Sequence, residues 1–578
     1  MAPKPVLKQE EFDEAVKTNI EDFGMEADEA VSSAVEEFQL QGYSLEGIIK
    51  SSSGGSTDSH PVAVATRALS VLASSAAEKS STAAAVDVQL QNLQLSVSAL
   101  QQQFKGLSGD DLQQALAVAA KEGSIAALLS AAKAAQQLLP GSTAKPSSCN
   151  AVLLPCLRTM RLLMQSPACR SSLLSGGGDD LLQRQLQGCC KALQSGGAEQ
   201  QQEQQQLAAA AAALTEAAAW QDEEGKCRFI DMGVAADLLQ LLQLLAATPG
   251  GVASAPQAAA AAAAAGAAAG ALRAFTTADD DRPPASKAFM HARLLAGKPN
   301  NALQVLLPVL QQLQQGPSRH IGPLVAVLAA IRQIAANDEI CKSFAEAGGV
   351  ASLQQLLAAA AVEGPPELVR GAAAALRQLA NSDAVKSQLA EAGALITLMR
   401  AVRLYGSHPA VQEQLLGLLV ALVLRMPDIA AAAAEAGGID VLTEVLAAAP
   451  AMAAEAKVSA AAAAANGVSA KAADGSAADA SNGNGSSSTA DADDNQEVAS
   501  KVFGVGGSGS SSSSMVAAVQ RQACMAVRNM VVRNPELRPG FLAAGAEDLL
   551  RAVKLLFPGS CKDVASAALR DLGLEHYN

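Results

Sequence analysis

Arginine recurs along the chain in a short string, Ala-apolar-Arg-x-apolar, whose side chains could bind carboxylates. Its four copies hold Arg273, Arg332, Arg377 and Arg528, and Arg158 lies in a similar string. A guanidinium is a flat fork of donors that matches a carboxylate, so a row of arginines suits an acidic protein segment. The candidate partner-binding residues are Arg273, Arg332, Gln333, Arg377, Gln378, Arg528 and Asn529. The alternative is that each arginine pairs with an acid of the neighbouring repeat or only coats the surface.

No group of residues has the types and spacing that catalysis or metal binding requires. The five histidines are isolated, and the nine cysteines lack the paired spacing of a zinc site. The segment Gly504 to Gly509 matches GxGxxG, but its neighbours lack the strand and helix that a dinucleotide site needs. We therefore expect a non-enzymatic protein with no catalytic residue, no cofactor and no metal ion.

A glycine recurs with fixed neighbours, and its spacing predicts a stack of helical repeats. Each copy has a large apolar residue or alanine four positions before the glycine and an apolar residue five positions after it. The glycines are Gly233, Gly348, Gly393, Gly437 and Gly545. The interval from Gly348 to Gly393 is 45 residues, and the next is 44. A period in the forties built from helices is typical of a solenoid.

Three helices make up each expected unit. The arginine string has apolar residues three positions apart, as on the buried stripe of a helix, and a break such as Asn381 to Asp383 follows it. A short helix then ends at the glycine, which enters the left-handed conformation without steric cost, and a second helix starts at once. This order of a short helix, a glycine, a second helix, a turn and a longer helix resembles the armadillo repeat. The resemblance implies an all-α, right-handed armadillo solenoid of roughly eight or nine units.

Weaker copies extend the pattern towards the N-terminus. The segment 173–182 fits the template around Gly177, and Phe289 to Leu295 reads as a unit whose glycine is replaced. Two homopolymer segments, Gln201 to Ala213 and Ala258 to Ala269, either lengthen helices or bulge out as loops.

The sequence predicts five parts. They are an acidic amphipathic helical arm over 1–50, a linker over 51–60, the solenoid over 61–452 with Ala/Gln-rich insertions near 200–213 and 250–270, a disordered Ala/Gly/Ser-rich insertion over 453–514, and a final unit with a C-terminal cap over 515–578. The insertion has almost no large apolar residue, so it cannot bury enough surface to offset its chain entropy.

The arm consists of two expected amphipathic helices. The first places Phe12, Val16, Ile20 and Phe23 on one face, and the second covers 28–38. The strings over 11–16 and 19–23, the acidic stretch over 29–38 and the apolar stretch over 45–49 are similar to the N-terminal signature of the armadillo repeat-containing protein 6 family. That family is described by its repeats and an interaction role, so the resemblance implies protein binding and no defined reaction.

Charge and hydropathy exclude two classes of partner. The formal net charge of −14 argues against nucleic-acid binding, which needs clustered Lys and Arg. The N-terminus has no apolar segment, and the longest strongly apolar run, Leu415 to Leu424, is about half a membrane span. We expect a soluble protein of the cytoplasm, and of the nucleus as well, that binds neither nucleic acid nor a membrane.

The expected function is that of a non-catalytic scaffold whose solenoid groove binds a protein partner. Known armadillo import receptors hold basic peptides with a ladder of Trp and Asn, and only Asn529 of that ladder is present here. Two alternatives stay open: a nucleotide-exchange cofactor of a heat-shock chaperone ATPase, and a nuclear transport adaptor. The acidic arm is a candidate ligand of the groove within the same chain.

Overall fold

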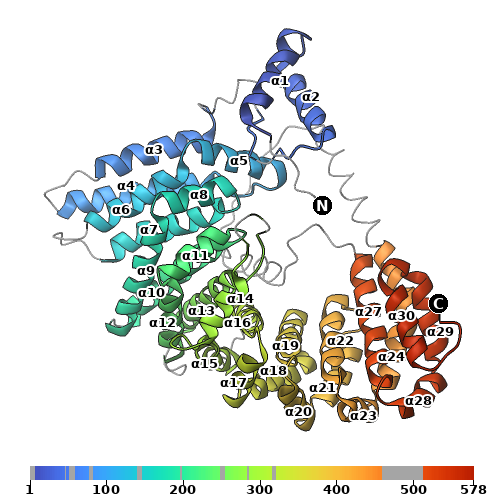
Figure 1. Cartoon of the computed structure of the whole chain (residues 1–578). Coiled ribbons are helices and arrows are strands. Elements are labelled where there is room, and N and C mark those ends of the chain that lie inside the picture. Colours follow the sequence, from blue (N-terminus) through green and yellow to red (C-terminus); the bar gives the residue numbers. More distant parts are fainter. Residues whose placement is uncertain are drawn as a thin grey trace, which may run out of the picture. The chain divides into compact units, whose positions relative to one another are not determined.

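The computed structural model describes residues 7–45, 47–50, 57, 59–76, 83–138, 146–195, 198–247, 254–280, 282, 285–315, 320–458 and 512–577. In those ranges the ordered elements are helices (Figure 1). Most of the linker and residues 459–511 of the predicted insertion lie outside the described residues. This arrangement confirms the all-α repeat fold predicted from the glycine spacing.

The helices fall into repeats of a short first, a second and a longer third helix. The first helices are α5 (Gly109–Lys121), α8 (Pro167–Ser175), α11 (Glu223–Asp231), α14 (Ala288–Ala296), α17 (Asp338–Glu346), α20 (Asp383–Glu391), α23 (Pro427–Glu435) and α28 (Arg538–Ala543), the last preceded by the 3₁₀ turn η1 (Pro535–Leu537). The second helices are α6 (Ser124–Leu138), α9 (Gly178–Ser195), α12 (Val234–Ala247), α15 (Ala302–Gln315), α18 (Gly349–Glu363), α21 (Ala394–Leu404), α24 (Gly438–Ala447) and α29 (Ala546–Leu556). The third helices are α7 (Pro146–Leu163), α10 (Ala198–Ala219), α13 (Ala255–Phe275), α16 (Ile321–Ile334), α19 (Pro366–Leu379), α22 (Pro409–Val423), α27 (Ser512–Val531) and α30 (Pro558–Asp571).

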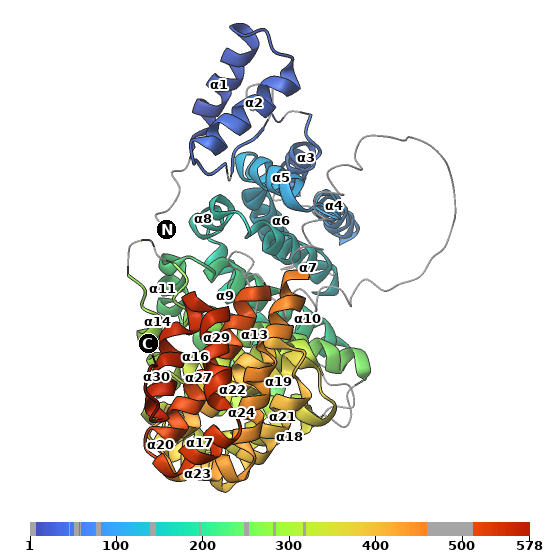
Figure 2. The same cartoon turned by 90° about the vertical axis from the view of Figure 1, so that its right-hand side faces the viewer.

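The chain divides into two compact units, Met1–Lys287 and Ala288–Asn578. Among the described residues, the first unit holds the repeats that begin at α5, α8 and α11, and the second holds the five that begin at α14 and later. Within each unit every third helix packs on the third helix of the next repeat, as α19 does between α16 and α22 (Figure 1). A third helix also packs on the second helix of its own repeat, as α7 does on α6 (Figure 2). Third helices therefore form a continuous layer in each unit, and they are the elements that position the predicted arginines.

Glycines separate the first and second helices, as the spacing predicted. Gly233, Gly348, Gly393, Gly437 and Gly545 all have φ between 74° and 87°, a region that costs a side chain strain. In the repeat of α14 this place is taken by Asn301, with φ of 47°, which precedes α15. The repeat that begins at Phe289 therefore does have its glycine replaced, and asparagine is the residue that best tolerates the conformation.

The arm is a helical hairpin of α1 (Gln9–Glu21) and α2 (Ala27–Leu40). Phe12, Val16 and Ile48 are buried in its core, and Ile20 packs at the edge. Phe23 is 70% exposed because α1 ends at Glu21, so the expectation that it shares the buried face is wrong. The end of the arm contacts α5 of the first repeat. Lys50 N donates to Gln114 Oε1 (2.8 Å), and Gln114 Nε2 donates to Ile48 O (2.9 Å). Lys50 Nζ also forms an ion pair with Asp110 Oδ1 at 2.6 Å.

Between the arm and the first full repeat lies a pair of helices, α3 (Pro61–Ala76) and α4 (Ala83–Gln102). They form the end layer of the first unit, because α3 packs on α6 and α4 packs on α7 while nothing lies beyond them in the described part of this unit (Figure 1).

The homopolymer segments lengthen helices and do not bulge out. The Gln/Ala run lies within α10 and the Ala run within α13, and these two helices pack along each other. Alanine and glycine on α13 allow that close approach. By length and hydropathy, α13 is also the one single helix among the described residues that could cross a membrane, but 72% of its most apolar 18-residue segment is buried inside the fold.

The boundaries of the predicted insertion need correction at both ends. Residues 449–458 are helical, so helix continues for six residues into the segment expected to be disordered, and α27 begins at Ser512. Alanines over 449–456 are good helix formers and let the helix continue before the composition changes.

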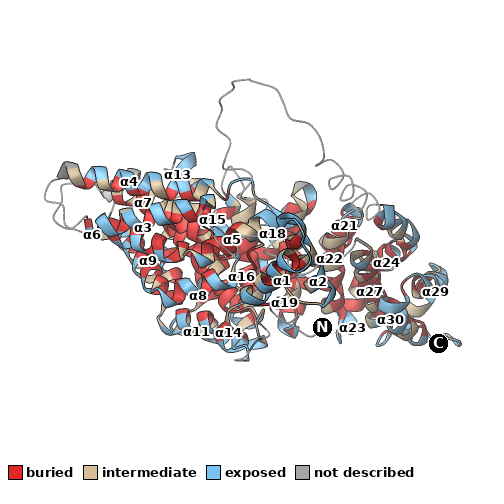
Figure 3. Ribbon diagram, turned by 90° about the horizontal axis from the view of Figure 1, so that it is seen from above, coloured by how far each residue is buried: buried red, intermediate tan, exposed pale blue. Residues whose placement is uncertain are grey.

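The core consists mostly of aliphatic side chains, alanines and thiols, with a few phenylalanines such as Phe229, Phe275 and Phe344. Figure 3 shows buried and exposed residues alternating along the helices. Eight of the nine cysteines are buried and Cys227 is half-buried. Burial raises the pKa of Cys149 and of Cys190 to about 12, with nearby acidic groups adding to the shift.

Candidate functional site

The predicted arginines lie on third helices, but their surroundings differ. Arg273 on α13 is only 7% exposed. Its Nη2 atom lies 3.1 Å from Oε1 of Glu216 on α10, and its guanidinium carbon lies 5.3 Å from the centre of the Trp220 ring. A side chain at Gly270 would overlap the Glu216 carboxylate, so the glycine makes room for this pair. Arg273 therefore links two repeats of the first unit through its ion pair with Glu216.

Arg528 on α27 is also paired within the fold. Its Nε atom lies 3.1 Å from Oδ2 of Asp571 on α30, and Nε of Arg570 lies 3.0 Å from the other carboxylate oxygen. The next residue, Asn529, donates from Nδ2 to Val420 O at 3.4 Å. Both residues join neighbouring third helices, as the alternative reading of the arginine row expected.

Arg377 on α19 is half-buried and lies over Gly417 of α22. A Cβ atom at Gly417 would sit 2.6 Å from Nη1 of Arg377, so this position must lack a side chain for the guanidinium to keep its place. In the described part of the second unit, no carboxylate forms an ion pair with Arg377. The neighbouring Gln378 donates from Nε2 to Ala335 O at 2.8 Å, just beyond the end of α16.

Arg332 and Gln333 occupy the equivalent positions on α16, one repeat earlier, and both are half-buried. The structure adds Arg370, which the sequence reasoning missed because it lies outside the recurring string. Arg370 is half-buried on α19, two helical turns before Arg377 and on the same side. Burial lowers the pKa of Arg370, and the carboxylates of Glu413 and Glu367 act against that effect.

The arginines of the row lie in different parts of the structure. Arg273 and Arg528 form ion pairs between repeats. Arg332 lies on α16, and Arg370 and Arg377 lie on α19, which packs on α16. Arg158 on α7 is exposed and stands in a different unit from this group. Arg332, Arg370 and Arg377, on two helices that pack on each other, are the candidate site.

A second set of cations lies in the first helices, three of them buried and Arg538 half-buried, and the sequence reasoning missed it. Arg170, Lys226, Lys386 and Arg538 each lie seven residues before the glycine of their repeat. Arg170 Nη1 donates to Met164 O at 2.7 Å, Lys226 Nζ to Thr277 O at 2.7 Å, and Lys386 Nζ to Leu424 O at 3.0 Å. All three carbonyls follow the ends of third helices, where unpaired carbonyls and the helix dipole favour a cation.

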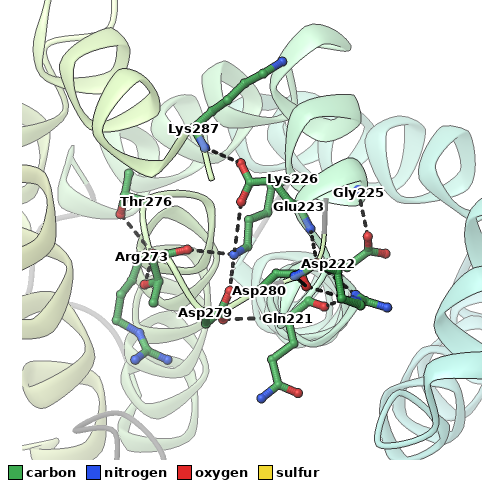
Figure 4. Close-up of polar contacts among 12 residues, drawn as sticks. Gln221, Asp222, Glu223, Gly225, Lys226, Arg273, Thr276, Asp279, Asp280 and Lys287 are labelled. Carbon is green, nitrogen blue, oxygen red and sulfur yellow. Dashed lines mark hydrogen bonds and ion pairs between the residues drawn. The ribbon is translucent and has the colours of Figure 1, made fainter. Parts of the chain in front are cut away.

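Lys226 is the centre of the polar network in Figure 4. Its ammonium also contacts Asp279 and lies 3.8 Å from Glu223, and both Lys226 and Glu223 have fully buried side chains. Glu223 Oε1 accepts from Lys287 N at 2.7 Å. These hydrogen bonds and ion pairs link the segment after α13 to the start of α11, so the role of the network is structural.

Asp280 completes this network. Its carboxylate accepts from Glu223 N at 3.1 Å and forms an ion pair with Arg282 at 2.8 Å. The hydrogen bonds from Arg282 hold the pKa of Asp280 well below its usual range. Neither here nor in the rest of the described residues do three His, Cys, Asp or Glu side chains come together as a metal-binding group.

Comparison with known proteins gives one family match. Residues 6–80 match the model of the armadillo repeat-containing protein 6 N-terminal domain, which confirms the resemblance seen in the arm. No curated protein matches the chain.

Solved structures that match the chain include two engineered proteins. One is 18% identical over 90% of this chain and 97% of its own, with a TM-score of 0.47, and the other is 18% identical over 59% and 99%, with a TM-score of 0.37. A third comes from a study of a phosphorylation switch that controls the interaction between cadherin and beta-catenin. It is 14% identical over 97% of this chain and 95% of its own, with a TM-score of 0.48.

Proposed function

We propose that this chain, whose residues 6–80 match the armadillo repeat-containing protein 6 N-terminal domain, is a non-catalytic scaffold for a protein partner. The partner lies along the third helices of the second unit. The observation that supports this most is that two packed helices carry three arginines, Arg332 on α16 and Arg370 and Arg377 on α19, with the Arg377 guanidinium over Gly417.

The chemistry of this surface favours a carboxylate-rich segment as the ligand. Arginine forks bind carboxylates through two parallel hydrogen bonds, and such charge-assisted bonds contribute about 1.5–3 kcal/mol each. Arg332 and Arg377 stand on neighbouring helices whose axes are roughly 8–10 Å apart, which an extended peptide spans in about three residues. A ligand with acidic residues at that interval would engage both arginines.

Binding of a labelled peptide of alternating Glu and Ser tests the proposal. Fluorescence anisotropy should show binding to the full chain, and the double variant R332Q/R377Q should weaken it at least about 10-fold, since a tenfold change corresponds to about 1.4 kcal/mol. The matched control is R403Q, which removes an exposed arginine from the second helix α21, where it pairs with Glu444 at 2.8 Å. The control should bind as the wild type does.

Other outcomes would redirect the assignment. Equal affinity of the double variant and the wild type would contradict the proposed surface. Binding of a Lys-rich peptide in place of the acidic one would favour the nuclear transport adaptor, and faster ADP release from a heat-shock chaperone ATPase would favour the exchange cofactor.

The acidic arm is the ligand that the chain itself could supply to this surface. Glu10, Glu14 and Glu21 are exposed on α1, four and seven residues apart, which places them along one side of the helix. If the arm competes with the partner, replacing all three by Gln should raise the affinity for the acidic probe. An unchanged affinity would exclude this competition. Under the same proposal the protein acts in the cytoplasm and the nucleus, which imaging of a tagged chain would test.

A further inference from the structure

The end layer of the first unit, α3 and α4, exposes large aliphatic side chains on its outer side. Val64 and Val71 of α3 are 54% and 69% exposed, and Val88 and Leu95 of α4 are 55% and 62% exposed. Each pair is seven residues apart, so each lies along one side of its helix. We call this surface, with the exposed small and amide side chains between them, the α3/α4 face.

The inner sides of the same helices are occupied. Leu69 on α3 and Leu90, Leu93 and Val97 on α4 are buried, since α3 and α4 pack on each other, on α6 and on α7. In the described part of the first unit, no helix covers the outer side (Figure 1). The exposure therefore belongs to the end of a stack and not to a loosely packed helix.

Charge is nearly absent from this face. The 16-residue α3 contains one charged residue, Arg67, and the 20-residue α4 contains one, Asp87. The Arg67 guanidinium forms an ion pair with Glu122 at the end of α5, with Nε 3.0 Å from Oε2. A stack that ends in water needs a polar terminal layer. The layer at the other end of the chain meets this need, because α30 carries Lys562, Asp563, Arg570 and Asp571 in 14 residues.

Depletion of charge, more than hydrophobicity itself, distinguishes the centre of a protein interface from ordinary surface. The chain as a whole carries a net charge of −14, so most of its surface repels a second copy. The α3/α4 face lacks that repulsion. A contact between two identical faces sets a patch against its own copy, so a patch with a net charge of one sign would repel it and an almost uncharged patch does not. A strongly charged partner would find no complementary group there.

We propose that the α3/α4 face is the contact through which two copies of this chain form a symmetric dimer. The helices are about 24 Å and 30 Å long and their axes lie roughly 8–10 Å apart, so each copy contributes about 500 Å². The total of about 1,000 Å² is at the lower end of specific interfaces, which predicts a reversible dimer. This inference does not depend on the proposed ligand of the second unit.

Sedimentation velocity of the full chain over about 1–100 µM tests the dimer, a range that brackets the affinity of weak interfaces. The molar mass should rise from that of one chain to that of two. The variant V71E/L95E should stay a monomer throughout, because it places acids in the middle of both faces. The matched control is I396E/L404E, two residues of α21 that are 70% and 52% exposed in the second unit, and it should dimerise as the wild type does.

A mixing experiment separates lost contact from lost folding. V71E/L95E and V71K/L95K should each be monomeric, and an equal mixture of the two should form a heterodimer, because acids then meet lysines in any pairing of the four positions. A wild type that stays monomeric at 100 µM, a dimer that survives V71E/L95E, or a mixture that does not associate would each overturn the proposal. A monomeric control variant would overturn it as well.

Discussion

At the scale of the residue, the buried cations of the first helices show how one side chain links the ends of two elements. Lys386 has a 2% exposed side chain, and its ammonium joins Asp383 of its own helix to the carbonyl of Leu424 at the end of α22. Lys342, in the preceding repeat, makes the same kind of contact with Asp338 but is 49% exposed. Comparing Lys386 with Lys342 therefore separates the effect of burial on stability from the effect of an ion pair with aspartate.

Replacing Lys386 by Met should therefore destabilise the protein, whereas Lys342→Met should not measurably do so. The first change leaves the Leu424 carbonyl without its donor, at a cost of about 1–3 kcal/mol. The second removes an exposed pair, and such pairs contribute little. Urea unfolding followed by circular dichroism measures both. Equal shifts of the two variants would show that Lys386 has no special role at the helix end.

The sequence shows that these cations occupy equivalent positions, but it does not predict that Arg170, Lys226 and Lys386 are buried. A repeat alignment on the glycines puts Arg170, Lys226, Lys386 and Arg538 in one column. A lysine on an amphipathic helix usually lies on the solvated side. Its burial here depends on where the third helix ends in space, and only the packing of the repeat decides that.

At the scale of the element, the repeat boundaries were the most predictable feature. The five glycines fixed the junctions of first and second helices, because each junction needs a backbone conformation that few residues adopt. The arginine string placed the third helices correctly, but it could not tell Arg273, which Glu216 holds, from Arg377, which lies over Gly417. That difference arises from residues 40 to 57 positions away in the chain.

Residues 459–511 should be dispensable for the packing of the elements on either side. Helix α24 packs on α27, and α27 packs on α22 and α30, so the described repeat is complete without the segment. Replacing 459–511 by a Gly/Ser linker of about 15 residues should change the unfolding free energy by no more than about 1 kcal/mol, since loop closure depends only weakly on length. A large loss of stability in calorimetry would show that the segment contributes contacts.

At the scale of the whole molecule, stability should be local, because each repeat contacts mainly its neighbours. The single tryptophan, Trp220, lies in the first unit, and Lys386 lies in the second. Lys386→Met should therefore lower the urea midpoint of part of the circular dichroism signal and leave the Trp220 fluorescence midpoint nearly unchanged. Equal shifts of both signals would mean that the 578 residues unfold as one cooperative system.

The buried cysteines can report local unfolding of the repeats that contain them. Because burial raises the pKa of Cys156, Cys169, Cys341, Cys524 and Cys561, these thiols stay protonated at neutral pH and are poor nucleophiles while the helices are closed. They are distributed over repeats from α7 to α30. An alkylating reagent applied in a pulse would label each cysteine-containing repeat when it opens. Mass spectrometry of the labelled peptides would give the order in which those repeats unfold.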